Sequence, residues 1–192
     1  MAKKILNPSA SLLPCPIGLI TTQGNDGKPN IITLAWMGMI ASDPPMVSIS
    51  VRGTRFSYKL LKENGDFVIN IPDSKDLEKI DFCGTVSGRN TDKFKEANFT
   101  FEQANKVKAP VILECPVNIE CRTREVLSYL THNAFIAEIL SIQVNEEVVE
   151  KEGGKWNIEK INPLVYCPSS QEYWALGKKI GNYGFSKGKI DK

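Results

Sequence analysis

The sequence contains a single histidine, His132, and this scarcity excludes several kinds of active site. A zinc motif with two histidines cannot form, and Cys115 and Cys121 are six positions apart, which is not the spacing of a zinc knuckle. We therefore expect no metal site. A serine or thiol hydrolase would have to use His132 as its base, and the nucleophile motif G-x-S-x-G is absent.

The chain also lacks the glycine-rich signatures of the common nucleotide-binding folds. No G-x-G-x-x-G follows a strand-like run and no G-x-x-x-x-G-K-[ST] occurs, so neither a Rossmann nor a P-loop mode of binding is supported. Basic and acidic residues, 24 and 22, nearly cancel to a net charge of +2. So small a charge predicts binding neither to nucleic acid nor to an anionic membrane.

Long apolar runs and a secretion signal are missing as well. Apolar stretches are interrupted after a few residues, so none is expected to span a membrane. The start, MAKKILNPSASLLPCP, has two lysines but no apolar core long enough for a signal peptide. The five cysteines are odd in number and scattered, as is typical of reduced thiols. We expect a cytoplasmic protein.

What is present is the composition of an ordinary globular domain. The chain has 192 residues, of which 42% are hydrophobic and 24% charged, and it shows no internal repeat or linker. Residues 1–192 are therefore expected to form one domain. Short strand-like runs dominate, at 17–22, 31–40, 46–52, 67–71, 117–122, 126–131 and 134–144.

Helical pattern is limited. A helix is predicted over 54–64 with Thr54 as its N-cap, and shorter helices are predicted after Asp73-Ser74 and after Asn90-Thr91. The tail after Pro163 is expected to be irregular. Because the βαβ alternation of a parallel sheet is missing, the pattern predicts a mainly β fold, an antiparallel barrel with a few short helices.

Two turn segments have the residues of an anion site. In the first, Ser48, Ser50 and Arg52 share the polar face of a strand that leads through Gly53 into the predicted helix. A solvent-facing strand edge with an ordinary cap explains this segment more simply. The second, Ser87-Gly88-Arg89-Asn90-Thr91-Asp92-Lys93, has the same elements, and a surface loop is the alternative there. Two such turns in one small barrel favour a phosphate at one of them.

Two further features are ambiguous by themselves. Thr33-Leu34-Ala35-Trp36 has a small residue beside an aromatic one, where a flat ligand could lie, although core packing explains the segment equally well. His132 follows Thr131 at the start of a strand, and a lone histidine is more often structural than catalytic.

The order and spacing of many short segments carry more information than any one of them. They are PCPIGLI at 14–20, GKPN at 27–30, TLAW at 33–36, SDPP at 42–45, SISVR at 48–52, FVIN at 67–70, SGR at 87–89 with DKF at 92–94, His132 with FIAE at 135–138, and an ending over 173–189 that contains GFSKGK. Together they resemble the flavin reductase-like family, whose fold is the FMN-binding split barrel, and within it the flavoredoxins.

The resemblance implies a homodimer with FMN near the subunit interface. It implies that Thr33, Leu34, Ala35 and Trp36 lie against the flavin ring, and that Ser48, Ser50, Val51 and Arg52 hold the ribityl chain and phosphate with Thr54 nearby. Ser87, Gly88, Arg89 and Lys93 would close over the phosphate or the ring edge. His132 and Phe135 match the segment beside the nicotinamide or substrate, and Tyr173 and Trp174 would cover the flavin from the same or the partner subunit.

The activity that the resemblance implies is electron transfer through bound FMN, with NAD(P)H or another redox protein as the donor. The alternatives are an electron carrier without enzymatic activity and a barrel that has lost its flavin. Thr131 stands where many of the better-known reductases have an acidic or glycine-containing turn, which favours a protein donor. Cys83 is expected to be a buried structural cysteine, with a reactive thiol near the flavin as the alternative.

Overall fold

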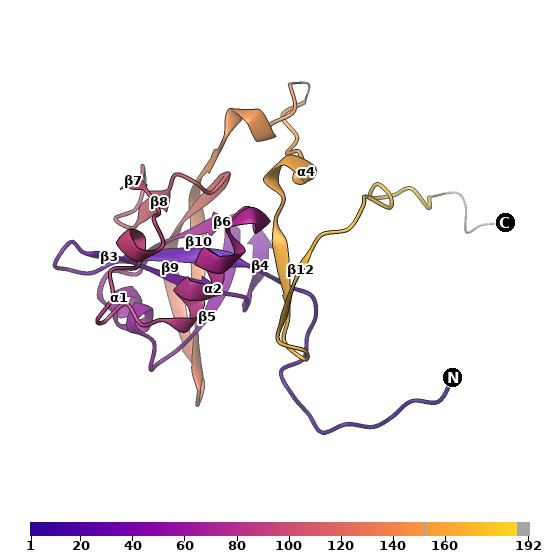
Figure 1. Ribbon diagram of the computed structural model, residues 1–192, viewed down its shortest axis with the longest axis horizontal. Coiled ribbons are helices and arrows are strands. Elements are labelled where there is room, and N and C mark those ends of the chain that lie inside the picture. Colours follow the sequence, from indigo (N-terminus) through magenta and orange to yellow (C-terminus); the bar gives the residue numbers. More distant parts are fainter. Residues whose placement is uncertain (152, 188–192) are drawn as a thin grey trace.

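The computed structural model describes residues 1–151 and 153–187, so residues 188 and 189 of the family-like ending lie outside the described residues. Its main element is a seven-stranded antiparallel sheet (Figure 1). From one edge to the other its strands are β3 (Pro29–Leu34), β2 (Gly18–Gln23), β6 (Asp66–Ile71), β9 (Val117–Ser128), β10 (His132–Val144), β5 (Pro45–Arg52) and β4 (Met37–Ser42).

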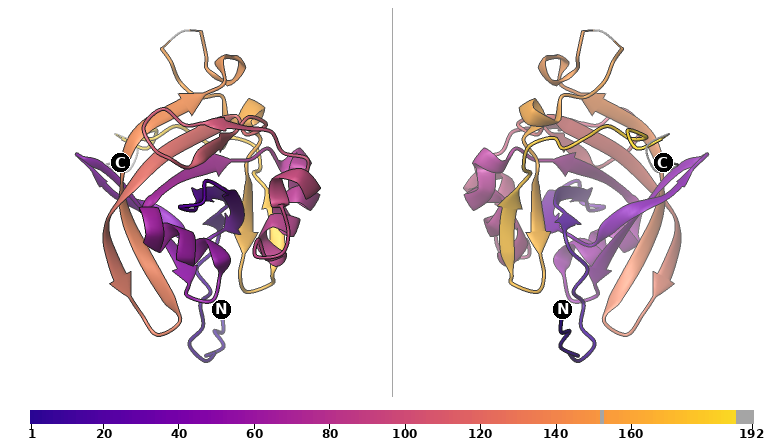
Figure 2. Two further views of the ribbon diagram at one scale, coloured as in Figure 1. Left: turned by 90° about the vertical axis from the view of Figure 1, so that its left-hand side faces the viewer. Right: turned by 90° about the vertical axis from the view of Figure 1, so that its right-hand side faces the viewer.

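The sheet curls around its core, and Figure 2 shows the strands bending around the interior. The Ser50 N–H donates to the Trp36 carbonyl at 2.9 Å, so the link between the two outer strands lies against β5. One buried cluster fills the curled sheet, with Ile20, Ile49, Phe67 and Phe135 among its members. The predicted fold class, an antiparallel split barrel with a few short helices, is confirmed.

Helices cover part of the sheet. They are α1 (Phe56–Asn64), the 3₁₀ helix η1 (Ser74–Asp76), α2 (Leu77–Thr85) and α3 (Lys93–Glu96). The second buried cluster lies beneath α2 and α3 and includes Ile31, Ile80 and Phe94. The two predicted short helices are confirmed, and each begins at an aspartate that accepts a backbone N–H: Asp73 from Lys75 at 3.0 Å and Asp92 from Lys95 at 3.2 Å.

Three local predictions were wrong. Helix α1 begins at Phe56 with Arg55 as its N-cap, and no side chain caps it, so Thr54 lies before the helix. The run 31–40 is broken at Ala35 and Trp36 into two strands on opposite edges of the sheet. The runs 117–122 and 126–131 belong mainly to one strand, β9, which continues to Ser128 through an irregularity in its pairing with β10.

The tail after Pro163 is also more regular than predicted. Strands β11 (Leu164–Cys167) and β12 (Glu172–Ala175) form a hairpin that pairs with β1 (Cys15–Pro16). The remaining elements are β7 (Phe101–Gln103), β8 (Pro110–Ile112), η2 (Glu146–Val148) and α4 (Ile158–Ile161). In Figure 1 the N-terminal segment and the segment that follows β12 extend away from the main sheet on the side of this hairpin.

No helix within residues 1–151 and 153–187 is long and apolar enough to cross a membrane.

A buried asparagine joins four segments of the fold. The amide of Asn70, on β6, donates to the carbonyl of Leu19 at 2.8 Å. Its Oδ1 accepts from the Ile112 N–H at 3.0 Å and from Asn118 Nδ2 at 2.8 Å. Because all these groups are buried, each would lose a partner without gaining water if the amide were removed.

We therefore expect Asn70→Ala to lower the free energy of unfolding by about 3 kcal/mol, because it leaves buried donors unpaired and opens a small cavity. Exposed Asn105→Ala is the matched control, with an expected change within about 0.5 kcal/mol. Urea denaturation followed by circular dichroism measures both. A loss below about 1 kcal/mol for Asn70→Ala would show that the amide does not hold these segments together.

Candidate functional site

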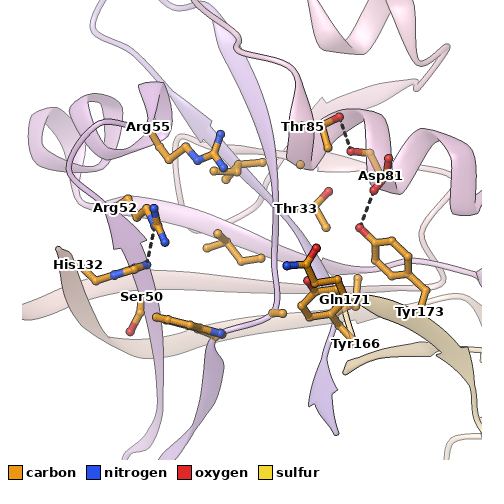
Figure 3. A pocket seen from close by; sticks show the side chains of 16 residues that line it. Thr33, Ser50, Arg52, Arg55, Asp81, Thr85, His132, Tyr166, Gln171 and Tyr173 are labelled. Carbon is orange, nitrogen blue, oxygen red and sulfur yellow. Dashed lines mark hydrogen bonds between the residues drawn. The ribbon is translucent and has the colours of Figure 1, made fainter. Parts of the chain in front are cut away.

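A cavity of about 560 Å³, called the large cavity below, opens beside the link between β3 and β4. Its floor is formed by the end of β3 and this link, from Ile32 to Trp36. Residues of β5 and β10 form one wall, and α2 with the β11–β12 hairpin forms the other (Figure 3). Segments from widely separated parts of the sequence thus meet around one space.

On the first wall an arginine, a histidine and a tryptophan are in contact. Arg52 and His132 are cross-strand partners of β5 and β10, and Arg52 Nε donates to His132 Nε2 at 3.4 Å. The ring of Trp36 stacks on His132 with 4.5 Å between the ring centroids. Thr131 Oγ1 lies 2.9 Å from the other ring nitrogen, Nδ1. A neutral imidazole suits these contacts, because Nε2 must be free of a proton to accept from Arg52.

The second wall is held by a hydrogen bond between α2 and the hairpin. Tyr173 donates its hydroxyl proton to Asp81 Oδ1 at 2.8 Å, and Figure 3 shows this pair facing Arg52 and His132 across the cavity. Burial and the bond to Asp81 raise the pKa of Tyr173, so the phenol stays protonated. Gln171, at the hairpin turn, has a left-handed backbone with φ of 58° and lines the cavity beside Tyr166.

A smaller pocket of about 140 Å³ adjoins the large cavity. The two share Ile32, Arg55 and Gly84 as lining residues, so these residues lie between the two spaces. The uncapped start of α1 contributes Phe56 and Ser57 to the small pocket. Free N–H groups at the first turn of a helix and a nearby arginine favour an anion.

The small pocket depends on a glycine. A Cβ atom at Gly88 would collide with the side-chain oxygen of Asn30, and would lie 3.3 Å from Phe56. Asn30 is itself fixed, because its Nδ2 donates to Ser57 Oγ at 2.7 Å. The loop 87–89 can therefore lie this close to β3 and α1 only with glycine at position 88.

Lys93 lies inside the same pocket. Its side chain is only 4% exposed, and Nζ donates to the carbonyls of Ile31 at 2.8 Å and Cys83 at 2.7 Å. Burial, together with the nearby charge of Arg55, lowers the pKa of Lys93 to about 8.

The structure brings together eleven of the fifteen residues predicted for the site. Thr33, Leu34, Ala35, Trp36, Ser50, Arg52 and His132 line the large cavity. Thr54, Ser87, Gly88 and Lys93 line the small pocket.

Four predicted residues line neither space. Ser48 lines a third hollow beside the N-terminal segment 9–16, which shares Ala35, Trp36 and Ser50 with the large cavity. Arg89 lines neither and donates Nη2 to the Thr54 carbonyl at 3.3 Å. The side chains of Val51 and Phe135 are fully buried in the core, because they face the interior of the sheet, so contact of these side chains with a ligand is not supported.

The sequence did not predict that Arg55 and residues of α2 line the site. It predicted Tyr173 there, but not the hydrogen bond from Tyr173 to Asp81. Arg55 was taken as helical because Thr54 has the better N-cap side chain. Asp81 and Thr85 lie one helical turn apart on α2, so they share a face, but nothing in the sequence says that this face meets the cavity. Trp174, predicted to cover the ligand with Tyr173, is 57% exposed and is not among the lining residues.

His132 gives the first wall a spectroscopic test, since it is the single histidine of the chain. Burial lowers the pKa of His132 below its usual value of 6.5, and the adjacent charge of Arg52 lowers it further. The folded chain thus takes up this proton less readily than the unfolded chain. Acidification below about pH 6.5 should therefore cost the folded state stability through this group.

We expect an NMR titration of the imidazole to give a midpoint below 6.5 for the unmodified chain, and a higher midpoint for Arg52→Gln. Arg124→Gln serves as the control, because Arg124 is paired with Glu138 on the surface. An unmodified midpoint above 6.5, or no upward shift in Arg52→Gln, would contradict the contact between Arg52 and His132.

Comparison with known proteins identifies relatives along nearly the whole chain. Residues 10–175 match the model of the flavin reductase like domain. The structure superimposes on flavoredoxin of Desulfovibrio vulgaris (Miyazaki F) with a TM-score of 0.91 and 31% identity, covering 97% of this chain and 100% of that one. Flavoredoxin from Methanosarcina acetivorans gives a TM-score of 0.89 and 30% identity, with 98% and 100% of the two chains covered.

A sequence relative points the same way. An uncharacterised protein of Archaeoglobus fulgidus is 30% identical over 142 residues, which cover 74% of this chain and 79% of that protein. The family match spans both walls of the large cavity and all the residues that line the small pocket. The chain belongs to the flavin reductase-like family.

Proposed function

We propose that this chain binds FMN in the two adjoining cavities and acts as an oxidoreductase that passes electrons through the bound flavin. The observation that carries the proposal is the small pocket, which adjoins the large cavity and is lined by the buried Lys93. FMN combines a flat ring system with a terminal phosphate dianion. When bound, it supplies the redox chemistry, and the protein positions it.

The large cavity suits the ring. Its volume of about 560 Å³ is in the range of small-molecule sites, and it has both apolar surface and polar groups. Trp36 and Ala35 offer a flat and a small surface, and Thr33 and Ser50 lie among the lining residues. Thr33 Oγ1 donates to the Ile80 carbonyl, which fixes its side chain against α2.

The small pocket suits the phosphate. Arg55 lies between the two cavities, and Ser87 and Lys93 line the pocket together with the uncapped start of α1. Guanidinium, ammonium and oriented N–H groups are the usual partners of phosphate. In this arrangement Arg55 and Lys93 bind the phosphate, whereas Arg52 lines the large cavity beside His132.

Two kinds of electron donor remain, and the proposal covers both. His132 lies at the wall of the ring cavity, where a nicotinamide from NAD(P)H could approach the flavin. The likeness to proteins named flavoredoxin supports the second candidate, a carrier that exchanges electrons with other redox proteins and has little turnover of its own.

We also propose that the protein works as a homodimer. Support comes from apolar side chains that the single chain leaves uncovered. On the edge strand β4, Met39 and Ile40 are 66% and 54% exposed, and in the N-terminal segment Leu12 is 83% exposed. An apolar edge strand next to the ligand cavity suits contact with a second copy.

The phosphate assignment is tested by Arg55→Ala. We expect it to weaken FMN binding by about 2 kcal/mol, roughly 30-fold, because a charge-assisted bond to the phosphate is lost, and to leave riboflavin binding within about twofold. Quenching of flavin fluorescence measures both dissociation constants. Arg124→Ala should bind both flavins like the unmodified chain.

Arg52→Ala distinguishes the two arginines. If Arg52 lines the ring cavity, its removal should change the affinities for FMN and riboflavin by similar factors. If Arg52→Ala lowered the affinity for FMN alone, and Arg55→Ala lowered the affinity for neither flavin, the phosphate would have to bind at Arg52 on β5.

The donor is tested by anaerobic addition of NADH and of NADPH to the FMN-loaded protein. An enzyme should bleach the flavin absorbance, and His132→Ala should slow the bleaching at least about tenfold while the flavin stays bound. Exposed Asn105→Ala, whose side chain lines neither cavity, is the control and should be reduced like the unmodified chain. Persistent flavin bands with both nucleotides would favour the carrier, and loss of flavin from His132→Ala would mean that the residue has a different role.

A further inference from the structure

Lys93 differs from the other cations of the site, Arg52, Arg55 and Arg89, in being buried, and it has no anionic partner among the described residues. None of the five ion pairs found among the described residues includes it. Its two hydrogen-bond acceptors, the carbonyls of Ile31 and Cys83, are neutral. A carbonyl can accept from an ammonium or from a neutral amine, although the bond from the ammonium is stronger, so these two contacts hold the side chain in place but supply no counter-charge.

The groups around Lys93 do not supply the missing charge. Arg55, at the start of α1, is positive. Cys83, on α2, is fully buried, and burial raises the pKa of its thiol to about 11, so it is neutral at neutral pH. At the N-cap of α3, the Asp92 carboxylate accepts the Lys95 N–H, and on the helix Lys95 and Glu96 are exposed.

A buried ammonium without a counter-charge is poorly stabilised, which is why the pKa of Lys93 falls to about 8. A phosphate dianion in the small pocket would provide that counter-charge and make the charged form favourable again. Phosphate binding and protonation of Lys93 are then linked. A bound phosphate raises the affinity of Lys93 for a proton, and by the same factor protonation of Lys93 raises the affinity of the protein for the phosphate.

We propose that FMN binding is coupled to protonation of Lys93, so that the protein takes up a proton with the cofactor in mildly alkaline solution and releases FMN as the pH rises. This rests on the proposed function, in that the small pocket receives the FMN phosphate. The coupling depends on the phosphate group. Riboflavin has no phosphate, so its binding is not coupled to protonation of Lys93.

The test is the dissociation constant of FMN at pH 7 and at pH 9.5, with riboflavin as the matched ligand. For a lysine that titrates near pH 8 in the free protein and stays charged in the complex, FMN binding weakens about 30-fold over this interval. Riboflavin should change less than about twofold, which also controls for the titration of the flavin ring itself.

Three variants assign the effect. Lys93→Met should bind FMN weakly at both pH values, with no pH dependence beyond that of riboflavin. Lys93→Arg keeps its charge throughout and should bind FMN equally at both. Lys95→Met, two positions along α3 and exposed, should behave like the unmodified chain.

A second measurement avoids any variant that fails to fold. Titration calorimetry of the unmodified protein at pH 9, in two buffers with different ionisation enthalpies, counts the protons taken up, and we expect close to one proton for each FMN and none for riboflavin. FMN binding that is equal at pH 7 and 9.5, or uptake near zero, would overturn the coupling and leave the proposed function intact. Failure to bind FMN even at pH 7 would overturn both.

Discussion

Two residues, Ala35 and Trp36, join the outermost strands of a seven-stranded sheet, and this short link forces the sheet to curl until its two edges meet. Strand β3 ends at Leu34 and β4 begins at Met37, although five strands separate them in the sheet. Two residues span only a few ångströms, so a flat sheet is excluded. The hydrogen bond from the Ser50 N–H to the Trp36 carbonyl fixes the link against β5.

The candidate site follows from that constraint. Because the link cannot pair in a regular ladder, it leaves a gap in the wall of the barrel where Trp36 stacks on His132 and the large cavity opens. Helix α2 and the β11–β12 hairpin complete the cavity, tied together by the bond from Tyr173 to Asp81. The start of α1 and the loop at Gly88 then form the small pocket beyond Arg55. The large cavity and the small pocket thus lie side by side, with Ile32, Arg55 and Gly84 lining both.

Strand alternation made much of the sheet predictable, since Val47, Ile49 and Val51 face the core as their spacing indicates. The hairpin after Pro163 was missed because its strands are four residues each and receive their support from β1, which is 150 positions away. Thr54 was preferred as an N-cap on local grounds, yet the chain places Arg55 there, where it lines the small pocket. In the site, hydroxyl, glycine and arginine residues identified the two turns, whereas the burial of Lys93 depends on packing that no local pattern shows.

The central claim is that one FMN occupies both spaces, with its ring in the large cavity and its phosphate in the small pocket. The most direct measurement is a crystal structure of the protein saturated with FMN. We predict phosphate density within hydrogen-bonding distance of Lys93 Nζ and Ser87, with the ring beside Trp36. Phosphate density at Ser48 and Arg52, or a ring outside the large cavity, would contradict it.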